Sequence, residues 1–576
     1  MNSKVLEPPL IETDVLIVGS GAAGLRAAIE AKSYGANVIL VDKLVIGYNN
    51  SSSFARGFIK AALPGMMDET SASQYITPNI TPKKHFIDIV EYGAYVNNQR
   101  LVEVMVLEAP GRVLELQEFG VQNPAVLRNS NPPRSGISLT KPLNETCAKL
   151  SVRRIPGMMV SDLLVQDGVV VGALAIDTIS SKPVILQSKT TILATGGVGE
   201  VYERNYTTQG STGDGCALAY RIGAEIIDPE FIMFGAFVTC EEDLPMWYIP
   251  PCEARWHAIL RNRKGEEFIS RYLEMKNPEG KTFQQKYGVS AGDIRELLAR
   301  WSCMEVVAGR GDRGAIHLDF TKVGDEVWNL DEESKYLRTC QMREWDMRDR
   351  PLRVLPGVVV TLGGVRINEW CETNVQGLFA TGEASGLVHG AGRRGGNALT
   401  ECIVFGARAG RRAADTAGHM RKVHPDQELI KQKIKGLIQI LNRQPSEDGD
   451  PALIRNFIQA VMWENVGPLR DAERLEKAIH ILQEIRQKRL PKIFAKTLLK
   501  LRKALETINL LYNAEMIAHA AIYRTESRGP THYRLDFPVS DNKNWLKNII
   551  IKNEGDSMKL WTEPIVVTTL TPPDSL

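Results

Sequence analysis

Paired cysteines are missing from this chain. Its 576 residues include eight cysteines, and no two of them form a CxxC pair. Zinc ribbons and iron–sulfur clusters use thiolates at such short spacings. The sequence therefore predicts no metal centre of its own, and dispersed cysteines are typical of a reducing compartment such as the cytoplasm.

Long hydrophobic runs and an excess of one charge are missing as well. No apolar run approaches the roughly 18 residues needed to cross a bilayer. The N-terminal segment MNSKVLEPPLIETD is too polar for a secretory signal. Lys and Arg together number 70 against 68 for Asp and Glu, so no basic field would hold nucleic acid. We expect a cytoplasmic protein with no direct membrane insertion and no nucleic-acid partner.

What the chain does contain is the composition of an ordinary globular protein. Hydrophobic residues make up 43% and charged residues 24%, which excludes disorder as its main character. The length predicts three to four domains.

The strongest local pattern is a βαβ unit near the N-terminus. The apolar strand at 14–18 runs into Gly19-Ser20-Gly21-Ala22-Ala23-Gly24, which is followed by a helical pattern and a second strand that ends near Asp42. Gly19 permits a tight turn, Gly21 lets the backbone approach a pyrophosphate, and Gly24 allows close packing of helix and strand. The terminal carboxylate of Asp42 suits ribose hydroxyls. Because strand, helix and acid fall in register, the pattern predicts a dinucleotide site.

The remaining patterns predict an α/β protein in several parts. Short alternating segments at 150–195 indicate a β-meander, and 212–224 indicates a helix. Aromatic and charged residues increase from about 231, which indicates an inserted domain. We predict a discontinuous Rossmann-like domain (1–230 and 356–425), an inserted α+β capping domain (231–355), a helical domain (426–540) and a C-terminal extension (541–576).

The helical domain is predicted from apolar stripes. Leu475, Ile479, Leu482 and Ile485 recur at helical spacing, and TLLKLRKALETINLLYNAEMIAHAAI makes a second stripe. Such stripes are typical of packing in a small helical bundle.

Several long motifs together resemble one family. The chain is similar to the succinate dehydrogenase and fumarate reductase flavoproteins, a family that includes L-aspartate oxidase and, more distantly, adenylylsulfate reductase. The resemblance implies an extended FAD in the first domain and a mobile cap that closes over its isoalloxazine ring. The motifs are DVLIVGSGAAGLRAAIEA, GFIKAAL, ILATGG, TGDGCALAYRIGAE, GEEFISRY, LFATGEASGLVHGAGRRGGNAL, VMWENVGPLRDAERLEKAI and ESRGPTHYRLDFP.

The resemblance also implies which residues bind FAD. Glu383 would hold the ribityl chain, and the helix start at Asn397 would face the pyrimidine end, where its positive potential offsets the charge of a reduced flavin. His389 is expected to shape the flavin site rather than act as an acid or base. The implied set is Gly19, Gly21, Ala22, Ala23, Gly24, Asp42, Lys43, Ser52, Ser53, Arg56, Gly57, Ala194, Thr195, Gly196, Asp214, Glu383, His389, Asn397, Ala398 and Leu399.

The flavin is expected to be bound without a covalent link. Family members with covalent flavin carry a histidine upstream of a GGINAAL-like segment, and Ser51 stands at that position here. In this family the covalent bond raises the flavin potential, so we expect a poorer oxidant.

The substrate shell departs from the family pattern at several positions. Gly235 stands where dicarboxylate enzymes have a histidine, Pro250 and Pro251 where they have a Thr-Glu pair, and Val359 where they have a second histidine. A site that has lost such donors should reject the ligand that needs them. We therefore expect a small anionic substrate other than succinate or fumarate.

Two arginines of the family pattern are retained. The resemblance assigns proton transfer to Arg271 and carboxylate binding to Arg393, and an arginine fork suits an oxyanion. Their alternative role is to fix the cap to the FAD domain through buried ion pairs. Tyr248, Arg255, Trp256 and His257 are new residues in the cap, and they either line a different pocket or pack within a rearranged cap.

Three functions agree with these features. The first is an FAD enzyme that exchanges hydride with an anionic substrate and electrons with an iron–sulfur partner, since the chain lacks cluster ligands. The second is an electron-transfer subunit without its own substrate, and the third is an adenylylsulfate reductase-like enzyme. Each implies an oligomer or complex, which a partner could hold at the membrane surface.

Overall fold

A computed structural model describes most of the chain. The described residues are 8–55, 59–63, 80–122, 136–178, 182–250, 252–274, 295–339, 346–555 and 557–574. Arg56 and Gly57, two of the predicted FAD residues, lie outside them.

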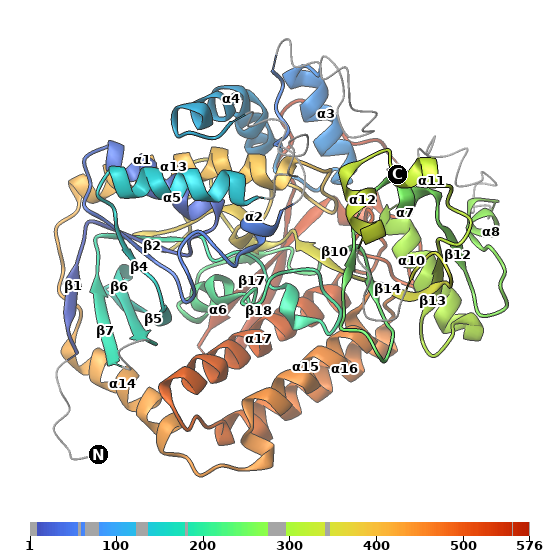
Figure 1. Ribbon diagram of the computed structural model, residues 1–576. Coiled ribbons are helices and arrows are strands. Elements are labelled where there is room, and N and C mark those ends of the chain that lie inside the picture. The colour runs from blue at the N-terminus through green and yellow to red at the C-terminus, as the bar shows by residue number, and fades with distance from the viewer. Residues whose placement is uncertain are drawn as a thin grey trace.

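A five-stranded parallel sheet forms the centre of the N-terminal half. Its order is β16 (Leu378–Ala380), β8 (Thr190–Leu193), β2 (Val15–Val18), β3 (Val38–Val41) and β4 (Arg153–Ile155). Its central strands are apolar on both faces, as a covered parallel sheet requires. Helices α1 (Ala22–Ser33), α5 (Ile137–Lys149) and α13 (Asn397–His419) lie over one face (Figure 1). The predicted βαβ unit is confirmed by the parallel pairing of β2 with β3.

The predicted meander is also present. Strands β5 (Met158–Gln166), β6 (Val169–Asp177) and β7 (Lys182–Gln187) pair antiparallel in sequence order, and β1 (Leu10–Glu12) adds to β7 in parallel. The other helices of this half are α2 (Ser51–Phe54), α3 (Pro82–Tyr92), α4 (Gln99–Glu118) and α6 (Asp214–Arg221).

A separate sheet is inserted between β9 (Ile226–Ile227) and β15 (Gly364–Val365). Its order is β11 (Tyr248–Ile249), β10 (Ile232–Thr239), β14 (Leu352–Thr361), β13 (Ile316–Asp319) and β12 (Ile259–Arg261). Helices α7 (Glu253–His257), α8 (Ile269–Glu274), α10 (Arg295–Glu305), α11 (Asp325–Trp328) and α12 (Glu332–Thr339) surround it (Figure 1). Phe268, Phe320 and Trp328 are fully buried in its own core. We refer to this inserted unit as the cap.

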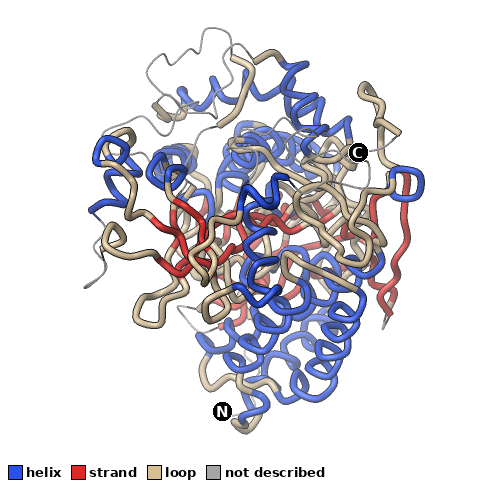
Figure 2. The backbone as a smooth tube through the Cα atoms, turned by 90° about the vertical axis from the view of Figure 1, so that its right-hand side faces the viewer, coloured by secondary structure: helices blue, strands red, loops and turns tan. Residues whose placement is uncertain are grey.

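The C-terminal third begins with the predicted helices. They are α14 (Gln427–Asn442), α15 (Pro451–Val466), α16 (Ala472–Glu484) and α17 (Leu498–Tyr523), and Figure 2 shows this helical region below the strands. Leu475, Leu482 and Ile485 are buried as expected, and Ile479 is partly buried against the same core.

The chain ends in a hairpin that the sequence patterns did not indicate. After the short helix α18 (Asn542–Trp545), β17 (Lys547–Glu554) pairs with β18 (Ser557–Pro564) and also with β9. The last segment thus joins a sheet whose other strands, β9 and β15, come from far earlier in the chain.

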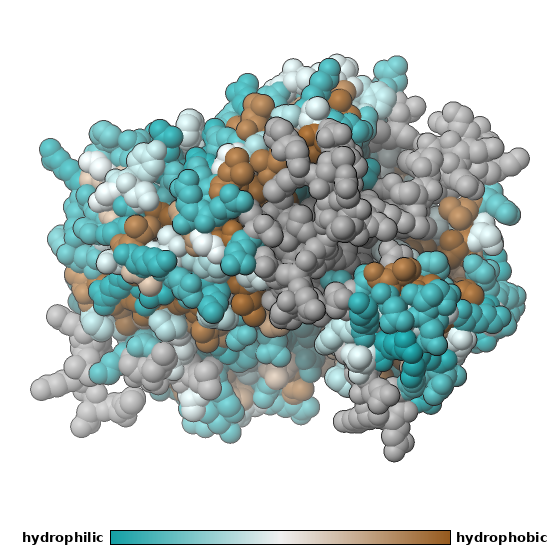
Figure 3. Space-filling view, turned by 45° about the horizontal axis from the view of Figure 1, so that its top comes forward, coloured by the Kyte–Doolittle hydropathy of each residue, from teal (hydrophilic) through white to brown (hydrophobic). Residues whose placement is uncertain are grey.

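Among the coloured residues of the face in Figure 3, hydrophilic side chains predominate, with small hydrophobic areas between them. No helix among the described residues has both the length and the apolar character that crossing a membrane requires.

Candidate functional site

The Gly-rich turn leaves no room for side chains at two of its glycines. Gly19 has φ +105°, and a Cβ there would lie 2.3 Å from the carbonyl oxygen of Ala194. A Cβ on Gly24 would lie 1.9 Å from the carbonyl oxygen of Gly19. A Cβ on Gly21 would have Ser52 Oγ as its nearest atom, at 3.4 Å, so the backbone at this glycine is open on that side. The turn thus presents the first amides of α1 to a ligand.

Asp42 is held in place at the end of β3. Its Oδ2 accepts hydrogen bonds from the Ser20 amide at 2.8 Å and from Ser20 Oγ at 2.6 Å, and its Oδ1 accepts from the Leu44 amide at 2.8 Å. The carboxylate therefore sits beside the Gly-rich turn, where the resemblance places the ribose.

Lys43 and Asp214 contact each other. Lys43 Nζ lies 2.7 Å from Asp214 Oδ2 and 3.2 Å from Glu506 Oε1. Burial disfavours the charged lysine, but the two carboxylates raise the pKa of Lys43 above its usual value. The pair links β3 to α6 and α17, and its role toward FAD stays a prediction.

The serines of α2 lie against the start of α1. Ser52 Oγ accepts a hydrogen bond from the Ala22 amide at 3.1 Å. The Ser53 amide donates to Asn50 Oδ1 at 2.9 Å, which caps α2. After β8, Thr195 Oγ1 accepts from the Gly215 amide at 3.0 Å, and Gly196 adopts φ +74° with open space around it. Three predicted segments thus meet at one edge of the parallel sheet.

A cavity of about 220 Å³ continues from this edge toward the cap. It brings together residues from both halves of the chain, including predicted ones and ones that the sequence did not suggest. The predicted residues on its wall are Ser52, Glu383, His389, Arg393, Ala398 and Leu399. Further residues on its wall are Phe54, Tyr206, Thr207, Thr208, Glu333, Thr361, Ser385, Glu401 and Cys402.

Two acids lie on this wall, Glu383 half-buried and Glu401 buried. Burial raises the pKa of Glu383 to about 7, although its Oε1 accepts a hydrogen bond from the Thr361 amide at 3.0 Å. Glu401 Oε2 lies 2.9 Å from His389 Nε2, and both side chains are about 5% exposed. The His389–Glu401 pair ties the loop before α13 to the helix itself, which agrees with a structural role for His389.

The two predicted arginines lie in different places. Arg393 is buried on the cavity wall, with Nη2 4.0 Å from Met233 Sδ. Arg271 in α8 is 45% exposed, and its guanidinium contacts Glu266 at 3.1 Å and Glu305 at 3.3 Å. Arg271 is not among the described residues that line the cavity.

Arg255 joins two segments of the cap. Its Nη1 donates to the Ile249 carbonyl at 3.1 Å and its Nη2 to the Gly235 carbonyl at 3.4 Å. The guanidinium also lies 5.0 Å from the ring of Phe237. Arg255 therefore crosslinks the segment at Gly235, one of the predicted departures from the family pattern, to the segment at Ile249. Pro251, another predicted departure, lies outside the described residues.

The other new cap residues divide between the cavity and the surface. Tyr248 reaches the cavity and stacks on Tyr206, with ring centroids 3.6 Å apart. His257 is exposed, and Trp256 is half-buried. Of the aromatic and basic residues that were candidates for a new pocket, Tyr248 is the one on the described cavity wall.

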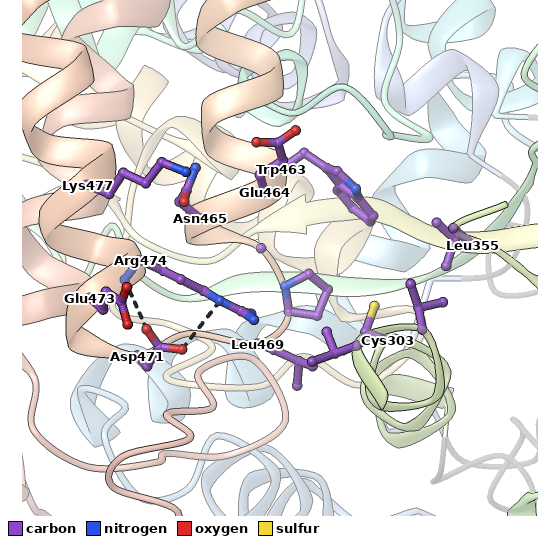
Figure 4. Close-up of a pocket in the computed structure, with 15 residues that line it drawn as sticks. Cys303, Leu355, Trp463, Glu464, Asn465, Leu469, Asp471, Glu473, Arg474 and Lys477 are labelled. Carbon is purple, nitrogen blue, oxygen red and sulfur yellow. Dashed lines mark hydrogen bonds and ion pairs between the residues drawn. The ribbon is translucent and has the colours of Figure 1, made fainter. Parts of the chain in front are cut away.

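A second cavity lies between the cap and the helical region. It has about 570 Å³ and is lined by Cys303 from α10, by Trp463 from α15 and by Arg474 and Lys477 from α16 (Figure 4). Arg474 is ion-paired with Asp471 at 3.4 Å. None of the predicted FAD or substrate residues that the structure describes lines it.

The arrangement fits a flavin dinucleotide. The Gly-rich turn leads into the N-terminus of α1, Asp42 stands at the end of the second strand, and the cavity leads to the N-terminus of α13. The Cβ positions at Gly19 and Gly24 show that these residues must be glycine for this approach. The described residues bring together no group of three or more His, Cys, Asp or Glu that could hold a metal ion.

Sequence reasoning missed Tyr206, Glu333 and Glu401. Tyr206 follows a β-bridge between Asn205 and Val358, and Glu333 comes from α12 in the cap. No local signal marks either residue, since each reaches the cavity through tertiary packing. Glu401 could have been found, because it lies one helical turn after the predicted Asn397.

Comparison with known proteins identifies the same regions. Residues 14–399 match the FAD binding domain model, and residues 455–575 match the fumarate reductase flavoprotein C-terminal model. A chain of the fumarate reductase (CoM/CoB) of Methanothermobacter marburgensis is 33% identical over 95% of this chain and 98% of its own. The fumarate reductase flavoprotein subunit of Escherichia coli is 27% identical over 97% of this chain and 95% of its own.

Solved structures agree with these matches. A quinol fumarate reductase chain from E. coli superposes with a TM-score of 0.82 at 27% identity, covering 98% of each chain. Adenylylsulfate reductase from Archaeoglobus fulgidus superposes with a TM-score of 0.75 at 18% identity, covering 97% of each chain. The second likeness concerns the fold alone.

Proposed function

The chain belongs to the fumarate reductase and succinate dehydrogenase flavoprotein family of FAD-dependent oxidoreductases, and we propose that it is the flavin-binding component of a redox complex that exchanges hydride with an anionic substrate other than a simple C4 dicarboxylate. The observation that carries the proposal is the cavity wall. It combines Arg393 and the N-terminus of α13 with Val359, where the family has a histidine.

In the proposed reaction, the cofactor and the residues of the chain have different roles. Bound FAD supplies hydride and electron transfer. Arg393 would bind an acidic group of the substrate through its planar fork. Tyr248 and Glu333 reach the cavity from the cap, and their hydroxyl and carboxyl groups could hold a proton at Oη and at Oε.

Arg271 is not among the described residues that line this cavity. Because its guanidinium is paired with Glu266 and Glu305, proton transfer by Arg271 requires α8 to move toward the cavity. We therefore propose Arg393 as the anion-binding residue and keep Arg271 as a candidate proton carrier for a closed cap. Loss of substrate turnover in both Arg271→Gln and Arg393→Gln would support the two roles. Unchanged turnover in Arg271→Gln would rule out proton transfer by Arg271 and leave only the anion-binding role of Arg393.

The partner would be an iron–sulfur protein. The chain has no CxxC pair that could hold a cluster of its own, so we expect its electrons to pass through another protein that holds one. The complex would reside in the cytoplasm or at the membrane surface through that partner. A flavin subunit without its own substrate is the second candidate, because Arg255 crosslinks the segments where the family binds dicarboxylates.

The test is to isolate the full chain under anaerobic conditions with whatever proteins accompany it. We expect sub-stoichiometric iron in the separated chain, stoichiometric or greater iron in the complex, and oxidation of the reduced flavin by at least one small organic anion. A complex that contains iron but reacts with no anion, while artificial acceptors still oxidise its flavin, would favour the electron-transfer subunit instead.

A further inference from the structure

A buried histidine contacts the helix that starts at the flavin site. His85 lies in α3 with no exposed surface, and its Nε2 is 2.8 Å from Asn397 Oδ1 at the first position of α13. Asn397 is only 1% exposed. We infer that His85 is a positioning residue of the flavin site, which fixes the amide of Asn397 and thereby sets the affinity of the site for reduced flavin.

The direction of this hydrogen bond follows from the partners. Asn397 Oδ1 is an acceptor, so His85 Nε2 must carry the proton and donate it. Burial lowers the pKa of His85 to about 4, so the imidazole is neutral near pH 7 and carries a single proton. That proton is used at Nε2, and His85 Nδ1 has no hydrogen-bond partner among the described residues. With that proton at Nε2, the ring faces the oxygen of the Asn397 amide.

The consequence for Asn397 is a fixed orientation. With its oxygen turned to His85, its Nδ2 points away from α3. The residues on either side of Asn397, Gly396 and Ala398, both line the cavity. Asn397 itself is not among the described residues on the cavity wall, so its contact with His85 acts on the cavity through the backbone of these two neighbours.

Other side chains in the first turns of α13 are also held by contacts with distant segments. Thr400 Oγ1 donates to the Lys60 carbonyl at 2.7 Å, and Glu401 is paired with His389 at 2.9 Å. Ala398 and Leu399 carry amides that an α-helix cannot satisfy at its start. The contacts of Asn397, Thr400 and Glu401 thus hold a set of N–H donors in one arrangement before any ligand arrives.

A preorganised donor set matters most for the reduced cofactor. The resemblance places the pyrimidine end of the flavin at this helix start, where reduction adds negative charge. Fixed donors stabilise that charge without the cost of reorganisation. Without the contact to His85, the start of α13 and the backbone donors beside the cavity would be held less firmly. Removing His85 should therefore weaken binding of reduced FAD more than binding of oxidised FAD.

The experiment uses the full chain with FAD and compares two substitutions at one position. His85→Leu removes the donor, whereas His85→Gln keeps an N–H close to the position of Nε2. We expect His85→Leu to lower the affinity for reduced FAD about tenfold more than for oxidised FAD. For this two-electron couple a tenfold change in that ratio corresponds to a midpoint potential lower by about 30 mV. His85→Gln should stay within about threefold of the wild type in both affinities.

A matched control separates this role from packing of α3. Phe86→Leu alters the next buried residue of the same helix, whose side chain carries no hydrogen-bonding group. It should lower the melting temperature without moving the potential. A shift in Phe86→Leu equal to that in His85→Leu would mean that looseness of α3 is responsible, and the inference would be wrong.

A second pair of variants keeps the test decisive if His85→Leu folds poorly. Asn397→Ala removes the group through which His85 acts, so it should lower the midpoint potential by about as much as His85→Leu. Asn397→Asp keeps the acceptor for His85 but replaces Nδ2 with a second oxygen, and it should lower the potential by at least as much as His85→Leu. An unchanged potential in Asn397→Asp would overturn the inference.

Discussion

At the Gly-rich turn, single glycines leave no space for a larger side chain. A methyl group on Gly24 would overlap the Gly19 carbonyl oxygen, which is backbone and cannot move aside. We expect Gly24→Ala to weaken FAD binding at least tenfold and to cost about 1–3 kcal/mol in the free energy of unfolding. Fluorescence titration with FAD and denaturant unfolding measure both effects.

The control is a glycine with open space in a helix. Gly418, near the end of α13, has no atom within 4 Å of the position that a methyl group would take. Gly418→Ala should leave FAD affinity unchanged and should raise stability by about 0.5–1 kcal/mol. Equal losses of FAD in the two variants would contradict the role of the turn.

The raised pKa of the Glu383 carboxyl predicts a pH dependence of the stability of the apoprotein. Its pKa of about 7 exceeds the usual value, so the folded chain binds a proton that the unfolded chain releases. The resulting stabilisation is fully present below about pH 4.5 and is lost as the pH rises through 7. Asp228 shifts in the same direction, so the two must be separated by mutation.

Glu383→Gln makes that separation. The wild type should lose stability relative to Glu383→Gln between about pH 5 and 7, by on the order of 1.4 kcal/mol for each unit of pKa shift. Urea unfolding of both apoproteins at several pH values provides the measurement. Parallel stability curves for the two proteins would show that Glu383 is already ionised in the folded state.

At the scale of the elements, a cluster of buried ion pairs joins the segment after α17 to the segment after β9. Arg524 contacts Glu230 at 2.7 Å, Glu526 at 3.2 Å and Asp228 at 3.3 Å, and all four side chains are at most 4% exposed. Arg524→Met would leave the buried carboxylates of Asp228 and Glu230 without this cation, while Glu526 keeps its contact with Arg528, so we expect a loss of about 3–5 kcal/mol in the free energy of unfolding.

The matched surface arginine is Arg412 in α13. It is 40% exposed and contacts Glu372 at 2.7 Å. Arg412→Met should cost less than about 1 kcal/mol, because solvent screens an exposed pair. If calorimetry gave both variants the same melting temperature, the cluster would have no special part in stability.

The sequence predicted elements better than it predicted their contacts. The βαβ unit, the meander and the helical stripes follow from local periodicity, and all are present. The pairing of β17 with β9 could not be predicted, because strands so far apart share no local signal. The same reason applies at the site, where Gly19 and Asp42 follow from a motif, while His85 and Tyr206 depend on packing between distant segments.

At the scale of the whole molecule, the cofactor site is assembled from distant parts of the chain. The dinucleotide turn, α2, the end of β8 and the start of α13 all contribute to it. A ligand that binds only this folded arrangement stabilises it by mass action. We expect FAD at about 100 times its dissociation constant to add about 2.7 kcal/mol to stability, which thermal unfolding with and without FAD would detect. An unchanged melting temperature would contradict the assembly of one site from these segments.

The central claim is that this family member acts on an anion other than fumarate or succinate. The most direct measurement is to reduce the flavin of the purified full-length protein anaerobically, add fumarate and follow the visible flavin absorbance by stopped flow. We expect no reoxidation by fumarate, because Gly235 and Val359 stand where the family pattern has substrate-binding histidines. An artificial dye should still reoxidise the flavin. Rapid reoxidation by fumarate would contradict it.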